Sequence, residues 1–196
     1  MWTPCAAGAA EAAAPAREGA RVVATDVTES PGCRRLDVAS EKDWAELAAD
    51  LREAYGEVHG LVNNAGVTWR ARIDDVRPED MARVHAVNVI GPLLGIQHLA
   101  PLMPPDSSIV NVGSSAALTG HCPVAHRAGK WALRGLSHCW RRPRPTGSWA
   151  GARPRAVAAA YRRLITSAPE TVRTEPAGPT APCKIKRQTW IGLRPG

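Results

Sequence analysis

Short apolar segments alternate with longer amphipathic ones along the first two thirds of this 196-residue chain. The short segments are apolar throughout rather than at every second residue, which is typical of strands buried on both faces of a parallel sheet. Helices that connect parallel strands cover the two faces of such a sheet, so the pattern predicts an α/β fold of the doubly wound, Rossmann-like class. We expect strands at residues 20–26, 59–62 and 108–112 and helices at residues 8–19, 40–55, 77–94 and 125–139.

The net charge of +7 is concentrated at one end of the chain. Residues 138–196 hold 10 Arg and 2 Lys against two Glu, a net charge of +10, which leaves −3 for residues 1–137. The same stretch contains eight of the 17 prolines, which interrupt helices and central strands. We therefore expect a truncated Rossmann-type domain at residues 1–137 and a basic tail of doubtful structure, rich in Pro and Arg, at residues 138–196. Clustered arginine without interleaved aromatic residues is a weak indication of nucleic-acid binding, so no nucleic-acid partner is expected.

The cysteines and the hydropathy profile exclude several classes of protein. Five scattered cysteines without a C-x-x-C pair indicate reduced thiols rather than a disulfide framework or a zinc ribbon. The spacing of Cys122 and His126 with His138 and Cys139 matches no common zinc module, so no metal site is predicted. No run approaches the roughly 18 apolar residues of a membrane span, and the first residues lack the basic segment of a signal peptide. These features favour a cytoplasmic protein without a membrane partner.

The segment G-L-V-N-N-A-G at residues 60–66 is the most specific motif in the chain. Further features follow in a set order: Asp26 after one predicted strand, Asp37-Val38, Asn88 within V-N-V-I-G, and S-I-V-N-V-G-S-S before a helix that contains Lys130. This ordered set, over roughly residues 8–137, resembles the short-chain dehydrogenase/reductase family. The resemblance implies an oxidoreductase that uses NAD to interconvert a small secondary alcohol and a ketone. It also implies a homo-oligomer.

The resemblance implies a set of cofactor-binding residues. Asp26 lies 18 residues after Gly8, near the spacing of about 20 at which a carboxylate binds the ribose 2′-hydroxyl of NAD. A 2′-phosphate would meet like charge there, so we expect NAD rather than NADP; a turn-capping role is the alternative for Asp26. By the family pattern Asp37 and Val38 hold the adenine. The remaining contacts fall on a helix glycine, the N-N-A-G backbone and a lysine that binds the ribose: Gly8, Asn64, Ala65, Gly66 and Lys130.

In this family a serine polarises the substrate carbonyl, a tyrosine transfers the proton, a lysine lowers the tyrosine pKa, and an asparagine completes the relay. The nicotinamide supplies the hydride, so the protein positions the substrate and moves a proton. The resemblance places these roles at Ser114, with Ser115 as the alternative, at Lys130 and at Asn88. His126 stands where the family has its tyrosine, and an imidazole with an ordinary pKa of ~6.5 can exchange a proton. A loop histidine without a catalytic role is the alternative for His126.

Both ends of the chain depart from the family pattern. Residues 1–7 contain neither the first strand nor the T-G-x-x-x-G-x-G loop, whose last glycine alone is matched, by Gly8. Beyond Ser137 the family's R-V-N-x-V-x-P-G segment and final strand are missing. We therefore expect a sheet without its first and C-terminal strands, with a gap at its centre.

A shifted reading frame of GC-rich DNA would produce ends of this composition. On that hypothesis, alternative frames of the gene encode both missing motifs. A frameshifted or degenerate relative without catalytic activity is the alternative to an active enzyme.

Overall fold

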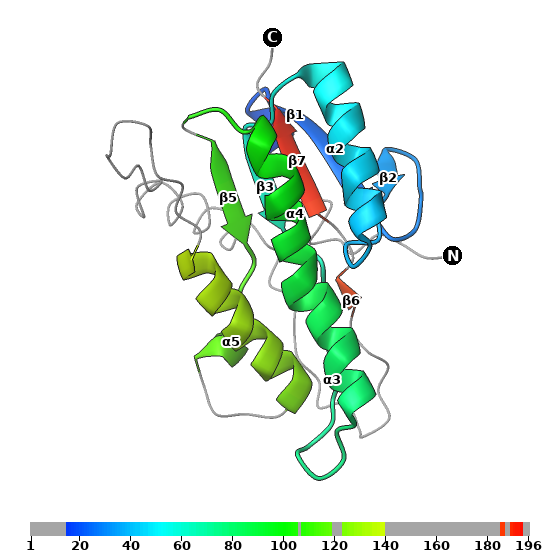
Figure 1. Ribbon diagram of the computed structural model, residues 1–196, viewed down its shortest axis with the longest axis vertical. Coiled ribbons are helices and arrows are strands. Elements are labelled where there is room, and N and C mark those ends of the chain that lie inside the picture. Colours follow the sequence, from blue (N-terminus) through cyan, green and yellow to red (C-terminus); the bar gives the residue numbers. More distant parts are fainter. Residues whose placement is uncertain (1–14, 106, 119–122, 140–184, 187–188, 194–196) are drawn as a thin grey trace.

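The computed structural model describes residues 15–105, 107–118, 123–139, 185–186 and 189–193 (Figure 1). Five strands form the main sheet, in the order β2-β1-β7-β3-β5, and two further strands, β4 and β6, pair with each other. The strands are β1 (Arg21–Asp26), β2 (Cys33–Arg35), β3 (Gly60–Asn63), β4 (Gly66–Val67), β5 (Ser108–Asn111), β6 (Ile185–Lys186) and β7 (Thr189–Leu193). The α/β class predicted from the sequence is confirmed.

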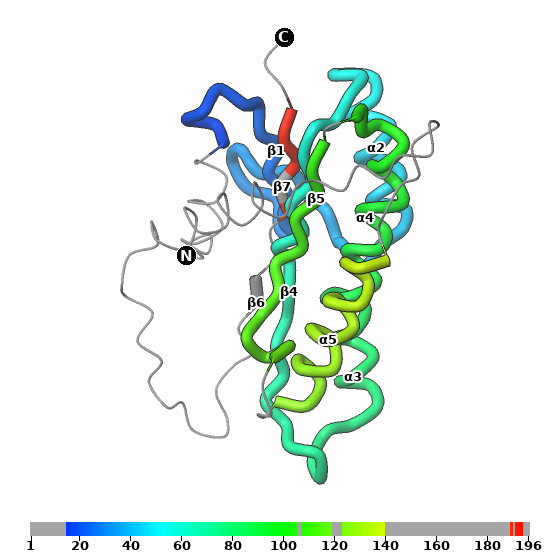
Figure 2. The backbone as a smooth tube through the Cα atoms, turned by 90° about the vertical axis from the view of Figure 1, so that its left-hand side faces the viewer, coloured from blue at the N-terminus to red at the C-terminus, as the bar shows by residue number. Residues whose placement is uncertain are grey.

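Four α-helices accompany the strands within the described residues: α2 (Glu41–Tyr55), α3 (Pro78–His85), α4 (Gly91–Leu99) and α5 (Val124–Cys139). In Figure 2 all four lie on the same side of the main sheet. Residues 15–17 are also helical, and residues 8–14 of the helix expected at 8–19 lie outside the described residues. None of the helices in the described ranges is long and apolar enough to cross a membrane.

Helix α2 has the boundaries that its sequence predicts. The hydroxyl of Ser40 accepts a hydrogen bond from the amide of Asp43 and caps the N-terminus, and Gly56 ends the helix. The predicted apolar positions are buried except for Tyr55, which is exposed: Trp44, Leu47, Ala48 and Leu51. Trp44 packs so closely against α4 that a Cβ on Gly95 would lie 2.8 Å from its ring. A glycine at this position allows the two helices to approach.

The long helix predicted for residues 77–94 is interrupted by one π-helical turn, Ala86–Ile90, between α3 and α4. The amide of Gly91 donates to the carbonyl of Ala86, five residues earlier, which is the spacing of a π-helix. Such turns are common at functional sites, and this one contains Asn88.

The centre of the sheet is occupied by β7, from the far end of the chain. β7 runs antiparallel to both neighbours, with Ile191 opposite Val23 of β1 and Leu61 of β3. Elsewhere in the main sheet the pairing is parallel, β1 with β2 and β3 with β5. In a doubly wound sheet this central position normally belongs to the first strand of the chain.

The expected gap at the centre of the sheet is therefore wrong. Strands β1 and β3 would otherwise face the gap with unpaired amides and carbonyls, which are costly to bury. An extended apolar segment in either direction can pair with them, and T-W-I-G-L is such a segment. Ile191 is 0 % exposed and Leu193 is also buried, so these two residues of the basic tail belong to the core.

Several expectations concern residues outside the described ranges. These are Gly8 with the rest of residues 1–14, Cys122, and the stretch 140–184. Within the described residues no strand precedes β1. Cys33 and Cys139, which are described, both have free thiols.

Candidate active site

Two of the predicted catalytic positions, Asn88 and His126, contact the backbone of Val67, in β4. The side chain of Asn88 accepts a hydrogen bond from the Val67 amide (2.8 Å) and donates one to the Val67 carbonyl (2.9 Å). His126 Nδ1 lies 3.3 Å from the same carbonyl. Asn88 is 0 % exposed, so its amide group is held in one orientation by the backbone of β4.

Lys130 lies one helical turn after His126 in α5, and residues four apart share one face of a helix. Its side chain is only 6 % exposed, and Nζ donates to the carbonyl of Val112 at 2.6 Å, just beyond β5. A Cβ placed on Gly66 would lie 3.3 Å from Asn88 Oδ1 and 3.9 Å from Lys130 Nζ. The amide, the ammonium group and the glycine backbone therefore converge on one small volume.

The electrostatic environment of His126 favours its neutral form. Burial lowers its pKa below the ordinary value, the hydrogen bond to Val67 opposes this, and the charge of Lys130 lowers the pKa further. A carbonyl oxygen can only accept, so the nitrogen that faces Val67, Nδ1, is the protonated one. In this tautomer Nε2 has a free lone pair and can accept a proton.

Ser114 follows β5 and begins a short 3-10 helix, Ser115–Ala117. Its hydroxyl accepts a hydrogen bond from the amide of Ala116 at 3.1 Å. Ser114 is partly buried, whereas Ser115 is exposed. Ser114 is thus the more buried of the two candidates for the catalytic serine, and its side chain is held by the local backbone.

Asp26 is the last residue of β1 and is buried. One carboxylate oxygen accepts a hydrogen bond from the amide of Thr28 at 3.0 Å, so the turn-capping role that was the alternative for this residue is present. A carboxylate has two oxygens and about four lone-pair sites, so the capping bond leaves capacity for a ribose hydroxyl.

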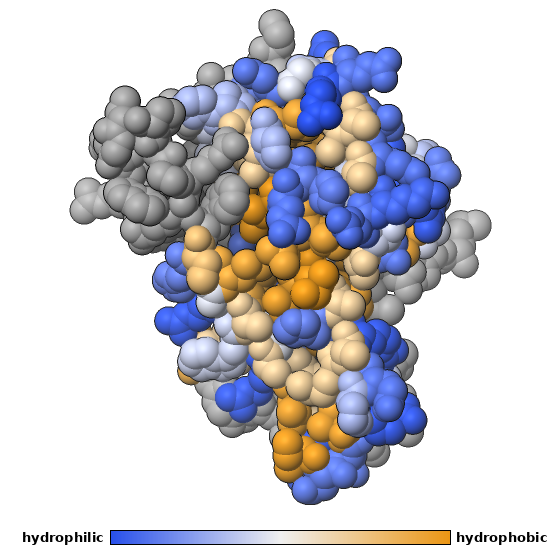
Figure 3. All heavy atoms as spheres, viewed as in Figure 1, coloured by the Kyte–Doolittle hydropathy of each residue, from blue (hydrophilic) through white to orange (hydrophobic). Residues whose placement is uncertain are grey.

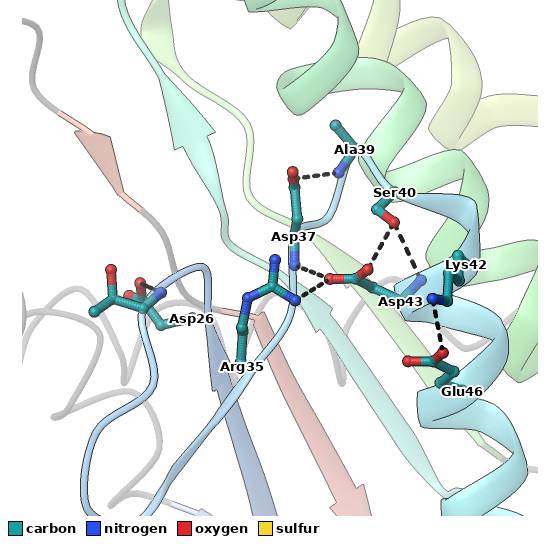
Figure 4. A network of polar contacts seen from close by, with 9 residues as sticks. Asp26, Arg35, Asp37, Ala39, Ser40, Lys42, Asp43 and Glu46 are labelled. Atoms are coloured by element: carbon teal, nitrogen blue, oxygen red, sulfur yellow. Dashed lines mark hydrogen bonds and ion pairs between the residues drawn. The ribbon is translucent and has the colours of Figure 1, made fainter.

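The loop of Asp37 and Val38 is held in shape by Asp43, at the start of α2 (Figure 4). Asp43 accepts hydrogen bonds from the Asp37 amide (2.9 Å) and the Ser40 hydroxyl (2.7 Å), and it pairs with Arg35. The bonds from Asp37 and Ser40 are the main causes that lower the pKa of Asp43 below its ordinary value. Val38 is buried, and its carbonyl accepts from Trp44 Nε1.

Two buried polar groups, Asn64 Oδ1 and Lys130 Nζ, could form hydrogen bonds with a dinucleotide. Asn64 is buried, and its Oδ1 has no hydrogen-bond partner among the described residues, which is costly unless a ligand or water supplies one. The ammonium group of Lys130 can donate three hydrogen bonds. The residues present therefore fit the polar groups of a nucleotide on the β3 side of the sheet.

The space itself is small. A shallow hollow beside this region has almost no room for a water molecule; it is lined by Val38, Asn63, Ala65, Gly91, Pro92 and Thr189. Pockets for ligands of drug size are typically ~300–1,000 Å³. Thr189, the first residue of β7, is buried and contributes to the lining of this hollow.

Two features of the site were missed by the sequence analysis. Asp43 could have been found, because S-x-x-D before an apolar run is a capping signature. The amide of Asn63 donates to Asn111 (2.8 Å), whose own amide donates to Ser137 in α5 (3.0 Å), a chain of bonds that ties α5 to the sheet. Nothing in the sequence indicates that Asn63 and Asn111 lie opposite each other.

No group of three or more His, Cys, Asp or Glu side chains is placed to hold a metal ion in the part of the chain that the structure describes. His126, which entered the four-residue metal hypothesis, instead contacts Val67. Cys122, its nearest partner in that hypothesis, lies outside the described residues.

Comparison with known proteins agrees with this arrangement. A family model described as enoyl-(acyl carrier protein) reductase matches residues 6–142. Trans-4-hydroxycyclohexanecarboxylate dehydrogenase of Sinomonas cyclohexanicum is 29 % identical over 153 residues, which cover 66 % of this chain and 59 % of that protein. A 3-alpha-(or 20-beta)-hydroxysteroid dehydrogenase of Mycobacterium bovis is 31 % identical, over 66 % of this chain and 56 % of that protein.

A solved structure of a short-chain dehydrogenase from Streptomyces avermitilis superposes with a TM-score of 0.63 at 27 % identity, covering 67 % of this chain and 54 % of that one. The chain thus spans somewhat more than half the length of these relatives. With the matching family model over more than half of its residues, the ordered motifs and the superposition, this chain belongs to the short-chain dehydrogenase/reductase family.

Proposed function

We propose that this chain is an oxidoreductase that transfers a hydride between a nicotinamide cofactor and a small secondary alcohol or ketone. The observation that carries the proposal is the convergence of Asn88, His126 and Lys130 around the backbone of Val67 and Gly66. Family membership implies a nicotinamide cofactor, which supplies the hydride when bound. The residues of the chain hold the reactants and move the proton.

In this proposal His126 is the proton-transfer group, in place of the family's tyrosine. A neutral imidazole with a free lone pair on Nε2 can accept the hydroxyl proton of an alcohol substrate. Because burial and Lys130 keep its pKa low, the protonated form needed to reduce a ketone is scarce at neutral pH. The chain should therefore favour alcohol oxidation over ketone reduction relative to tyrosine-bearing family members. Ser114 would position the substrate oxygen.

We assign NAD rather than NADP as the preferred cofactor. Support comes from the buried carboxylate of Asp26 at the end of β1, which suits a ribose hydroxyl and repels a phosphate. Asp37 and Val38 would flank the adenine, with Asn64, Ala65 and Gly66 along the cofactor and Lys130 on the nicotinamide ribose. Gly8 keeps its proposed place near the pyrophosphate, although it lies outside the described residues.

The names of two relatives indicate where to look for a substrate. One acts on trans-4-hydroxycyclohexanecarboxylate and another on a hydroxysteroid, and both names denote a hydroxyl group on a carbon framework of rings. We propose cyclic secondary alcohols as the first substrates to test.

We also propose that the folded chain forms a homo-oligomer. Figure 3 shows apolar side chains gathered over the face that carries α4, and such patches commonly mark contact surfaces between subunits. Analytical ultracentrifugation checks this; a monomer across the micromolar range would contradict it.

The test of the main proposal is NADH formation from NAD with cyclohexanol as substrate, followed by absorbance. The wild-type chain is compared with Lys130→Met, which keeps the length of the side chain but removes its charge and its hydrogen bonds. We expect slow turnover by the wild type and none by the variant. Equal rates for both would overturn the proposed site, and no turnover by the wild type with any cyclic alcohol would favour the inactive-relative alternative.

A further inference from the structure

The edge of the sheet proposed to bind the cofactor is lined by residues from the far end of the chain. β7 is antiparallel to β1 and β3, so its first residue, Thr189, lies at the edge where those two strands end. Ligands of doubly wound folds bind at this edge, at the point where the strand order reverses. In the order β2-β1-β7-β3-β5 that point is β7 itself.

Two sets of contacts hold this end of the chain in place. The hydroxyl of Thr25 donates to the carbonyl of Thr189 at 3.0 Å in a buried hydrogen bond. β6 pairs with β4, with Lys186 opposite Gly66 and Ile185 opposite Val67. The backbone proposed to pass along the cofactor is therefore already paired with the chain's own backbone.

These residues fall into two parts that differ in how firmly they are held. Ile191 and Leu193 are buried in the core, between β1 and β3. β6, by contrast, is a two-residue strand in a two-stranded sheet, a pairing that is marginal on its own. We call Ile185, Lys186 and Thr189 the covering segment. Thr189 is the end residue of β7 and, unlike β6, is buried and held by its pairing with Thr25 and by the Thr25 hydroxyl. Local opening of weakly paired strands does not require the core to unfold.

We propose that the covering segment is an internal competitor of the nicotinamide dinucleotide. It lies on the cofactor edge in the resting chain and leaves that edge when the cofactor binds, while Ile191 and Leu193 stay in the sheet. This inference rests on the proposed function, because it concerns the same site.

The competition lowers the apparent affinity for the cofactor in proportion to the fraction of chains in which the covering segment is open. The competition is steric: the backbone of β6, which pairs with β4, occupies the space proposed for the cofactor. Changes to the backbone of β6 should therefore matter more than changes to its side chains.

The experiment measures NADH affinity by fluorescence titration of the full chain, together with hydrogen exchange of the covering segment. Lys186→Pro disrupts the pairing of β6, because proline restricts the backbone and has no amide hydrogen to donate. Lys186→Ala is the matched control, which removes the side chain and keeps the backbone donor. We expect Lys186→Pro to lower the apparent Kd by about tenfold and Lys186→Ala to leave it near that of the wild type.

A second pair of variants acts at Thr189 from the opposite strand. Thr25→Val removes the hydroxyl that binds the Thr189 carbonyl, and Thr25→Ser retains it. We expect Thr25→Val, like Lys186→Pro, to tighten NADH binding. In the wild type, NADH should speed exchange of the amides of the covering segment but not those of Ile191 and Leu193.

The outcomes separate the two proposals. NADH binding that leaves exchange of the covering segment unchanged or slower would overturn the competition and spare the proposed function. Equal affinities in the proline and alanine variants, or in the valine and serine variants, would also overturn it. Failure of every variant to bind NADH or NADPH, with the covering segment shown open in Lys186→Pro, would overturn the proposed function and this inference with it.

Discussion

The two sides of β7 differ in what their polar side chains do. On the β3 side, Asn88, His126 and Lys130 converge on a short stretch of backbone. On the β1 side, Asp26 and Asp43 are engaged in shaping their own loops. We therefore expect the proposed catalytic side to be organised before a ligand binds, whereas the polar side chains of the proposed nucleotide side stabilise the fold.

The strand between these two sides explains the difference. Any strand that fills the centre restores the pairing of β1 and β3, so the fold tolerates either direction. Cofactor binding is more demanding, because a parallel first strand would lead into a glycine loop at the cofactor edge, while β7 brings Thr189 there. We therefore expect β7 to preserve the core of the sheet better than it preserves the proposed cofactor site.

The largest expected effect is a loss of kcat at the proposed catalytic side. His126→Gln preserves a group that can donate to the Val67 carbonyl but cannot accept a substrate proton. Loss of a general acid or base typically costs ~10²–10⁴ in rate, and we expect a fall in kcat of at least about 10². The measurement is NAD-linked oxidation of the best cyclic alcohol, with cofactor affinity measured in parallel.

The control for that variant is His138→Gln, an exposed histidine in the same helix. It should leave kcat unchanged. A similar fall in both variants would point to damage to α5 rather than to loss of the proton-transfer group.

The next effect tests whether β7 is part of the core. Ile191→Ala should lower the free energy of unfolding by about 2–5 kcal/mol, the usual cost of truncating a buried isoleucine. Ile73→Ala makes the same chemical change at a residue that is 71 % exposed, and should cost less than about 0.5 kcal/mol. Urea denaturation of both variants checks this. Similar losses would mean that β7 does not sit in the core in solution.

A smaller effect is expected on cofactor preference, at the proposed nucleotide side. Asp26→Ala should shift the ratio of NAD to NADP affinity toward NADP by about tenfold, because the carboxylate no longer binds the ribose hydroxyl or repels a 2′-phosphate. Calorimetric titration with both cofactors measures the ratio. Because Asp26 also caps the turn at Thr28, Asp26→Asn serves as a control that can keep the cap without the charge. An unchanged ratio in both variants would remove Asp26 from the cofactor site.

The sequence predicted the local structure well and the long-range pairing poorly. Helix α2 follows from the Ser40 cap, the apolar spacing and Gly56, all of which act within a few residues. β7 depends on which strands its five residues join, and no local pattern specifies a partner more than 100 residues away. The apolar run T-W-I-G-L lies within the stretch rich in Pro and Arg that we predicted as a basic tail of doubtful structure.

The candidate site shows the same division. Asn88, His126 and Lys130 were placed by motif order, and the structure brings them together. The pairing of Gly66 with Lys186, however, joins two regions that the sequence gives no reason to connect.

The smallest expected effect concerns Asp43, which orders the loop before α2. Asp43→Ala should cost about 1 kcal/mol of stability, as for the loss of a helix-capping pair. Because the folded-state pKa of Asp43 is lowered, its contribution is fully present above the unfolded pKa and is lost as the pH falls through the lower folded value. The difference between wild type and variant should therefore be constant near pH 7 and shrink below about pH 4. The control is Asp50→Ala in the same helix, which removes an exposed ion pair with Arg34 of β2. It should cost a few tenths of a kcal/mol at most. Denaturation at several pH values measures both, and equal losses at neutral pH would show that Asp43 has no special role in the loop.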